Sequence, residues 1–148
     1  MNLKEIILEV IEEQMHRPQI GININDKEQD FTGQILRGEK VIETRPNHAF
    51  KKLVGKRVGL LRTGKGKAHL VGYAEVGSPI FYKTEEDFRR DYGKHLVKPM
   101  SGHDIQLPKG KVGYPLSNVR VLKKPKPIKT VKIVGDGGGY SWRWFTVI

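Results

Sequence analysis

The sequence predicts an α+β fold, a small mixed or antiparallel β-barrel with helices at its periphery. Short apolar runs rich in β-branched residues are joined by glycine-rich or charged turns, a pattern typical of hairpins. The helical patterns are inserted among these runs and do not alternate with them, which argues against a doubly wound parallel sheet. A chain of 148 residues is the size of one domain that buries its own core.

The N-terminal segment, residues 1–17, predicts an amphipathic helical extension. Apolar side chains recur at helical spacing between Leu3 and Ile11, with glutamates on the opposite face. Asn2 can cap the start of this helix. Pro18 ends it, because the residue before a proline is pushed out of the helical region. We expect the helix to pack on its own domain, and a contact between two copies of the chain is the alternative.

Two further helices and six strands are expected after this extension. Asp26 is expected to cap a helix that ends at Gly38, and Thr84 a helix that ends at Gly93. The other expected segments are strands at 20–24, 41–45, 57–62, 68–76 and 114–122, an irregular basic loop at 94–110, a stiff extended connector at 123–127, and a final strand that carries Tyr140, Trp142 and Trp144.

The composition excludes several classes of protein. The chain has no cysteine, so it forms no disulfide and no thiolate metal site, which fits a reducing cytoplasm. No apolar run approaches the roughly 20 residues that a membrane-spanning helix needs. Glutamates interrupt the apolar residues of the N-terminus, unlike those of a signal peptide. The five histidines lack the spacing of metal ligands, and we expect neither a metal nor another cofactor.

One glycine-rich stretch comes close to a nucleotide-binding motif. GLLRTGK at residues 59–65 matches most of a P-loop, but Gly66 stands where that motif requires Ser or Thr to bind magnesium. The stretch also lies between two expected strands, whereas a P-loop joins a strand to a helix. A β-hairpin is the better interpretation.

Positive charge is concentrated in two blocks of the chain, which carries a net charge of +11 and has a pI near 9.9. Residues 37–72 hold ten Lys or Arg against two Asp or Glu, a net charge of +8, and residues 94–132 hold ten against one, a net charge of +9. If the fold brings these blocks together, they form a face that attracts phosphates. The alternative is a solvated lysine-rich surface that serves solubility alone.

The segment at residues 38–45 concentrates groups that can perform chemistry. Strand alternation places Lys40 on one face and Glu43 with Arg45 on the other. A bulge would change this phase and bring Lys40 to Glu43, where a buried lysine of lowered pKa becomes a nucleophile or base. The alternative is a structural ion pair between Glu43 and Arg45 beside a solvated Lys40.

The same segment resembles the signature of a known family. ILRGEKVIETR at residues 35–45 is similar to the pattern I-x-x-G-x-K-x-x-E-x-R of ASCH domains, a branch of the PUA-like superfamily. GKRVG at 55–59, VGYAEV at 71–76 and GYPLSNVRVL at 113–122 resemble later strands of that family in the same order, although Pro115 stands where an aromatic residue is frequent. The resemblance covers roughly residues 20–128 and implies a PUA-like barrel, so we expect the domain to span residues 18–128. Residues 129–148 lie outside the resemblance and are expected to complete the domain with a glycine-aromatic strand.

The resemblance also implies a role with RNA. Some members resemble amidohydrolases that remove an acetyl group from N4-acetylcytidine, and others act as ribonucleases or as binders. In the amidohydrolases the lysine that matches Lys40 is the nucleophile or base, and it works with a threonine and a later glutamate. This chain has Glu43 in place of the threonine, and Glu86 is the candidate for the later glutamate.

Together these observations predict a nucleic-acid-binding protein, first of all for RNA, with a cleft for a base or nucleoside near Lys40 and Glu43. The alternative is a hydrolase of a modified nucleoside or a ribonuclease, with Lys40 and Glu43 as its tentative catalytic pair. Arg45, Glu86 and Tyr114 are expected to contact the ligand, and Tyr73 or Tyr82 are further candidates for stacking on a base. The residues expected to bind phosphates are Arg37, Lys51, Lys52, Lys56, Arg57, Arg62, Lys65 and Lys67.

Overall fold

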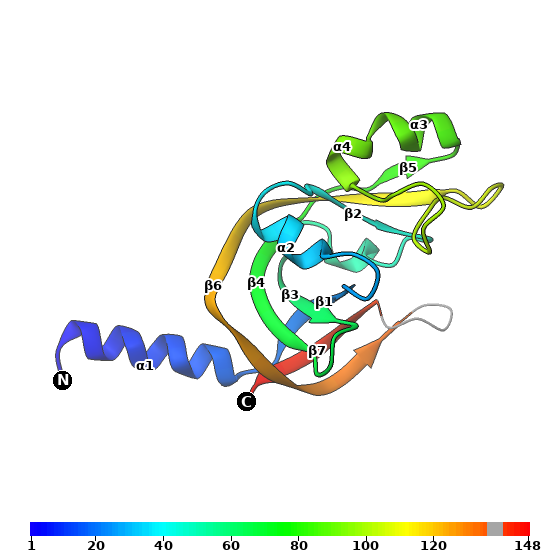
Figure 1. Cartoon of the computed structure of the whole chain (residues 1–148). Coiled ribbons are helices and arrows are strands. Elements are labelled where there is room, and N and C mark those ends of the chain that lie inside the picture. Colours follow the sequence, from blue (N-terminus) through cyan, green and yellow to red (C-terminus); the bar gives the residue numbers. More distant parts are fainter. Residues whose placement is uncertain (136–140) are drawn as a thin grey trace.

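The computed structural model describes residues 1–135 and 141–148, without the side chains of 11–15. Its strands join into a mixed sheet that curls into an irregular barrel with few helices, which confirms the predicted α+β class (Figure 1). The strands are β1 (Gln19–Asn25), β2 (Ile42–Arg45), β3 (Arg57–Thr63), β4 (His69–Val76), β5 (Ile80–Tyr82), β6 (Lys111–Val134) and β7 (Trp142–Val147). The helices are α1 (Leu3–His16), α2 (Phe31–Leu36), α3 (Glu85–Arg90), α4 (Tyr92–His95) and the short 3-10 helix η1 (Lys51–Leu53).

The long strand β6 holds the barrel together. Its first residues pair with β2 and β5, its middle with β4, and its last part with β7. Because β6 contacts both β4 and β7, the order β6-β4-β3-β1-β7 returns to β6 and closes a ring. Figure 1 shows β6 curving around the other strands along this path. All pairs are antiparallel except β1 with β3.

The parallel pair β1 and β3 is packed around one aromatic ring. Gly21 of β1 lies opposite Gly59 of β3. A Cβ atom at Gly21 would lie 2.8 Å from Cε1 of Phe145, and one at Gly59 would lie 3.0 Å from its Cζ. The two glycines therefore leave the space that the fully buried Phe145 fills. In the same register the last residues of the two strands, Asn25 and Thr63, lie opposite each other.

Two sequence predictions about local structure are wrong. The cap of α2 is Asp30, whose Oδ1 accepts a hydrogen bond from the Gly33 amide at 3.1 Å. Asp26 accepts the Thr32 amide at 3.0 Å, and it ties the loop before α2 to that helix. Residues 123–127 are extended as expected, but they are part of β6 and pair with β4. The short elements β5 and α4 were not expected from the sequence. Tyr140 lies outside the described residues.

The first helix leaves the body of the molecule, contrary to the expectation that it packs on its own domain. Figure 1 shows α1 projecting from the barrel beside the C-terminal end of the chain. Its apolar residues Leu3, Ile6, Ile7 and Val10 are all exposed. Near its end the Nδ1 atom of His16 lies 3.2 Å from the Val147 carbonyl oxygen. Among the described residues, no helix has both the length and the apolar character needed to cross a bilayer.

Candidate functional site

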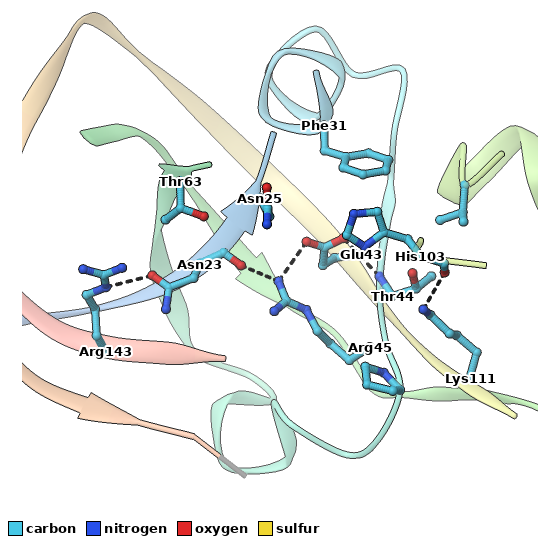
Figure 2. Close-up of a pocket in the computed structure, with 12 residues that line it drawn as sticks. Asn23, Asn25, Phe31, Glu43, Thr44, Arg45, Thr63, His103, Lys111 and Arg143 are labelled. Carbon is cyan, nitrogen blue, oxygen red and sulfur yellow. Dashed lines mark hydrogen bonds and ion pairs between the residues drawn. The ribbon is translucent and has the colours of Figure 1, made fainter. Parts of the chain in front are cut away.

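A cavity of about 340 Å³ opens where the ends of β1 and β3 meet β2 and the start of β6, and we call it the β1–β2 cavity (Figure 2). The parallel register pairs Asn25 with Thr63, so both side chains reach one rim. Asn23 lies two residues earlier on β1, and the ring of Phe31 from α2 lines the cavity. Glu43 of β2 faces these groups, which gives the wall both hydrogen-bond donors and acceptors.

The carboxylate of Glu43 is the centre of a buried polar network. Its Oε2 lies 3.0 Å from Nη2 of Arg45, and its Oε1 accepts the Thr44 amide at 3.1 Å. Nζ of Lys40 lies 3.6 Å from the same Oε1. Burial alone would raise the pKa of Glu43, but the charges of Arg45 and Lys40 outweigh it and lower that pKa. Glu43 is therefore an anion held in place by two cations.

Arg45 connects this network to the barrel. Its Nη2 also donates to the Asn23 carbonyl oxygen at 2.6 Å, and its guanidinium lies 4.5 Å from the centre of the Phe50 ring. Oδ1 of Asn23 in turn accepts a hydrogen bond from Nε of Arg143 at 2.8 Å. Figure 2 shows this chain of contacts running from β2 across β1 to β7. These contacts hold the guanidinium of Arg45 in one orientation, so that it presents the same edge to a ligand.

Lys40 lies behind the cavity and not in its wall. Its side chain has no solvent exposure and does not line the β1–β2 cavity. Its ammonium donates to the His95 carbonyl oxygen and lies 4.9 Å from the centre of the Phe31 ring. Burial lowers the pKa of Lys40, and Glu43 partly opposes that change. Lys40 and Glu43 thus approach each other, but only the carboxylate reaches the cavity.

Lys111, at the start of β6, lines the cavity although no motif in the sequence marks it. Its ammonium donates to the His103 carbonyl oxygen. Burial lowers its pKa to about 8, with Glu43 acting in the opposite direction. The His103 ring lines the same cavity and stands edge-on to Phe31, with ring centres 5.3 Å apart. No spacing links Lys111 to the segment 38–45, and only the pairing of β6 with β2 brings them together.

The structure does not bring the remaining predicted ligand contacts to this cavity. Tyr114 is fully buried in the core, with its ring 5.1 Å from that of Phe50. Glu86 lies on the exposed side of α3, where it pairs with Arg90 at 3.4 Å. The hydroxyl groups of Tyr73 and Tyr82 donate to Gln19 and Asp91. The only aromatic residues that line the cavity within the described ranges are Phe31 and His103.

The predicted phosphate-binding residues are divided between separate places. Lys56 and Arg57 lie at the start of β3, whereas Arg62, Lys65 and Lys67 lie at its other end, next to Thr63 of the cavity rim. A seven-residue strand separates these two groups by roughly 20 Å. Lys51 and Lys52 lie on η1, and Arg37 is engaged by Asp30 and Glu39.

Metal binding has little support from the side chains. Within residues 1–135 and 141–148 no three His, Asp or Glu side chains are grouped as metal ligands. The cations of Arg45, Lys111 and Arg143 around the β1–β2 cavity suit an anionic or polar organic ligand better.

The arrangement of strands has counterparts among solved structures. The crystal structure of ASCH from Zymomonas mobilis aligns with a TM-score of 0.56 over 84% of this chain and 85% of that one, at 13% identity. The chain has the ASCH fold. Two point-substituted variants of the same Zymomonas protein align with TM-scores of 0.53 and 0.55, at 14% and 16% identity. These cover 87% and 86% of this chain, and 89% and 90% of theirs.

The sequence itself finds no such match. No family model matches it, and no curated protein does. The resemblance of residues 35–45 to the ASCH signature is therefore supported through the fold alone, and in this chain Glu43, Thr44 and Arg45 of that segment line the cavity.

Proposed function

We propose that the protein binds single-stranded nucleic acid, RNA first of all, and accepts one unstacked base in the β1–β2 cavity. The observation that carries this proposal is the wall, which combines the ring of Phe31 with fixed donors and acceptors. Proteins that bind single strands stack bases on aromatic side chains and read their exposed edges by hydrogen bonds. A volume of about 340 Å³ is at the lower end of the range of ligand sites and suits one base better than a duplex.

The rigidity of the polar groups supports recognition of a particular base. Glu43 presents an acceptor and Arg45 a donor, and each is held by a second contact inside the protein. Groups fixed in this way lose little conformational entropy when a ligand binds. A base whose edge offers a donor to Glu43 and an acceptor to Arg45 is favoured over a base with the opposite pattern, which forms neither of these hydrogen bonds.

The test compares single-stranded RNA with duplex RNA of the same sequence by fluorescence anisotropy. We expect tighter binding of the single strand and a tenfold or larger loss in Phe31→Leu, because stacking contributes about 1 to 3 kcal/mol per base. Phe88→Leu is the matched control, since Phe88 is buried in a separate cluster with Tyr82 and Val97. Thermal melts show whether both variants remain folded. Equal affinity for duplex and single strand, or equal losses in both variants, would contradict the proposal.

The cationic residues at the two ends of β3 offer a second, internal comparison. Lys65 and Lys67 follow Thr63 of the cavity rim in the turn after β3, and Lys56 and Arg57 lie at the opposite end of that strand. We expect the double substitution of Lys65 and Lys67 by glutamine to weaken RNA binding and to lower the slope of log K against log salt by about 1.4, from two phosphate contacts at about 0.7 each. The same change at Lys56 and Arg57 removes equal charge and is expected to leave the slope almost unchanged.

One observation favours a second candidate, a hydrolase acting on a modified nucleoside or an RNA linkage. Lys111 places an amine with a pKa of about 8 in the cavity wall, and such an amine can act as a general base near neutral pH. Incubation with N4-acetylcytidine and with RNA, followed by mass spectrometry, detects turnover. This candidate expects the loss of turnover in Lys111→Met and its retention in Lys40→Ala, because Lys40 is sealed from the cavity. A loss confined to Lys40→Ala in a folded variant would assign the base to Lys40.

A further inference from the structure

A second cavity shares a wall with the first. It measures about 380 Å³ and lies under residues 102–111, and we call it the loop cavity. Pro46, His103 and Lys111 line both cavities, so these three residues form a wall between a ligand in one cavity and the space of the other. Lys109, in the turn that precedes β6, lines the loop cavity but not the β1–β2 cavity.

The loop around this second cavity is held by the carboxylate of Asp104, which accepts four hydrogen bonds. Asp104 accepts hydrogen bonds from both terminal nitrogens of Arg89, at 2.7 and 2.9 Å. It also accepts the amides of Met100 and Ile105, each at 2.8 Å. The hydrogen bond from Arg89 lowers the pKa of Asp104 to about 2, so this carboxylate stays ionised and its charge is balanced.

Cationic side chains line both cavities, and the two differ in the carboxylate that accompanies those cations. The β1–β2 cavity contains the carboxylate of Glu43, an acceptor suited to the edge of a base. In the loop cavity the carboxylate of Asp104 is covered by Arg89, while Lys109 is exposed and has no ion pair among the described residues. Together with Lys111 on the shared wall, Lys109 makes this cavity cationic. An anionic group beside a bound base is the ligand that this pair of cavities fits.

We propose that the loop cavity is a phosphate subsite, and that the ligand is a nucleotide, either within a strand or at its end, and not a nucleoside. This inference rests on the proposed binding of a base in the β1–β2 cavity. The base contacts Phe31 and Glu43, and the phosphate attached to its ribose contacts Lys109 and Lys111. The two contacts reinforce each other, because the base and the phosphate belong to one molecule and its binding in one cavity brings the other group to the second cavity.

Calorimetric titration tests the proposal with the four common nucleosides, their 3′- and 5′-monophosphates, and an abasic trinucleotide that has phosphates but no base. We expect at least one monophosphate to bind tenfold or more tightly than its nucleoside. Lys109→Gln is expected to weaken the binding of that monophosphate threefold or more and to leave the affinity for the nucleoside unchanged. Lys98→Gln is the matched control, because Lys98 is exposed in the same loop and lines neither cavity.

The outcomes separate this inference from the proposal on which it rests. Equal affinity for a nucleoside and both of its monophosphates would overturn the phosphate subsite and leave the base cavity standing. Equal losses in Lys109→Gln and Lys98→Gln would also overturn it, because they would show a general effect of net charge. If no ligand with a base binds more tightly than the abasic strand, the base cavity fails. Sensitivity of the abasic strand to Lys109→Gln alone would then support the subsite.

Discussion

The wall of the β1–β2 cavity and the outer face of α1 differ in the kind of side chain that the fold covers. Glu43 carries a charge, yet its side chain is only 8% exposed, and two cations lie within 4 Å of its carboxylate. Ile7 on α1 is apolar, yet it is 49% exposed. A globular domain normally has the reverse arrangement. The cost of burying Glu43 has been met by specific partners, whereas nothing in the described chain covers Ile7.

The difference between the two regions indicates that the buried network around Glu43, and not α1, is the rigid part of the fold. Removing a partner from a buried ion network leaves an uncompensated charge, so the network resists change. A helix on the outside gains little from its apolar face, so its sequence can change with small effects on the domain. The changes in the free energy of unfolding that substitutions cause should therefore differ between the two regions by several kcal/mol.

The largest effect is expected for Glu43→Gln. It leaves Lys40 and Arg45 buried without their carboxylate, and we expect the free energy of unfolding to fall by about 3 to 5 kcal/mol. Urea unfolding at pH 7 measures it. Because the pKa of Glu43 is lowered in the fold, its contribution is present above the ordinary glutamate pKa and is lost as pH falls through the folded value. A loss below about 1 kcal/mol would show that the network is not the rigid element.

The next effect concerns Lys111 and pH. Its amine is charged below a pKa of about 8 and neutral above it. We therefore expect the affinity for a nucleoside monophosphate to fall several-fold between pH 7 and pH 9. Glu43, Arg45, Asp104 and Lys40 act on this amine. The lowered pKa values of Glu43 and Asp104 keep both carboxylates charged in that window, whereas Lys40 is a second amine whose pKa is lowered by burial.

The Lys111→Met variant provides the control for this pH dependence. It should bind the monophosphate weakly and equally at both pH values, and a pH dependence that persists in it would assign the titration to another group. The same lowered pKa has a consequence for stability. The unfolded chain holds the lysine proton up to about pH 10.4. The free energy of unfolding of the wild type should therefore rise relative to the variant between about pH 8 and pH 10.

A smaller effect is expected for Lys40→Met. The substitution removes a buried cation whose desolvation opposes its attraction to Glu43, and Arg45 still pairs with the carboxylate. The His95 carbonyl oxygen loses one donor. We expect the free energy of unfolding to fall by less than the about 3 to 5 kcal/mol that the loss of a sole partner costs, because Arg45 remains as a second partner of Glu43. A loss as large as that of Glu43→Gln would show that both cations are required.

The smallest effect is expected for Ile7→Ala on α1. Alanine has the higher helix propensity and the side chain is half exposed, so we expect a change within about 0.5 kcal/mol. Ile22→Ala in the fully buried core is the matched control, with an expected loss of about 2 to 5 kcal/mol. Light scattering of the full chain and of one lacking residues 1–17 tests whether α1 joins two copies. A concentration-dependent melting temperature that Ile7→Ala abolishes would show that its apolar face is covered in a dimer.

The sequence by itself determined much of the local structure. The spacing of apolar residues predicted α1, β1 and the hairpin of β3 and β4, because these patterns depend on neighbours in the chain. The segment at 38–45 was singled out from its residue types and its resemblance to ASCH domains. The length of β6 was not predicted. Pro125 and Pro127 indicate a connector, because proline is rare inside strands, and only the pairing with β4 shows that this stretch continues β6.

Only the tertiary structure decided which side chains meet at the cavity. Antiparallel pairing of β2 with β6 places Lys111 near Glu43, and the bend before β2 turns Lys40 inward to the same carboxylate. The loop at 98–110 carries His103 to both cavities, although its sequence predicts no regular structure. Contacts between residues 60 to 100 positions apart have no periodic signal in the sequence. Burial, which sets the pKa of Lys111 and the reach of Lys40, exists only once the barrel has closed.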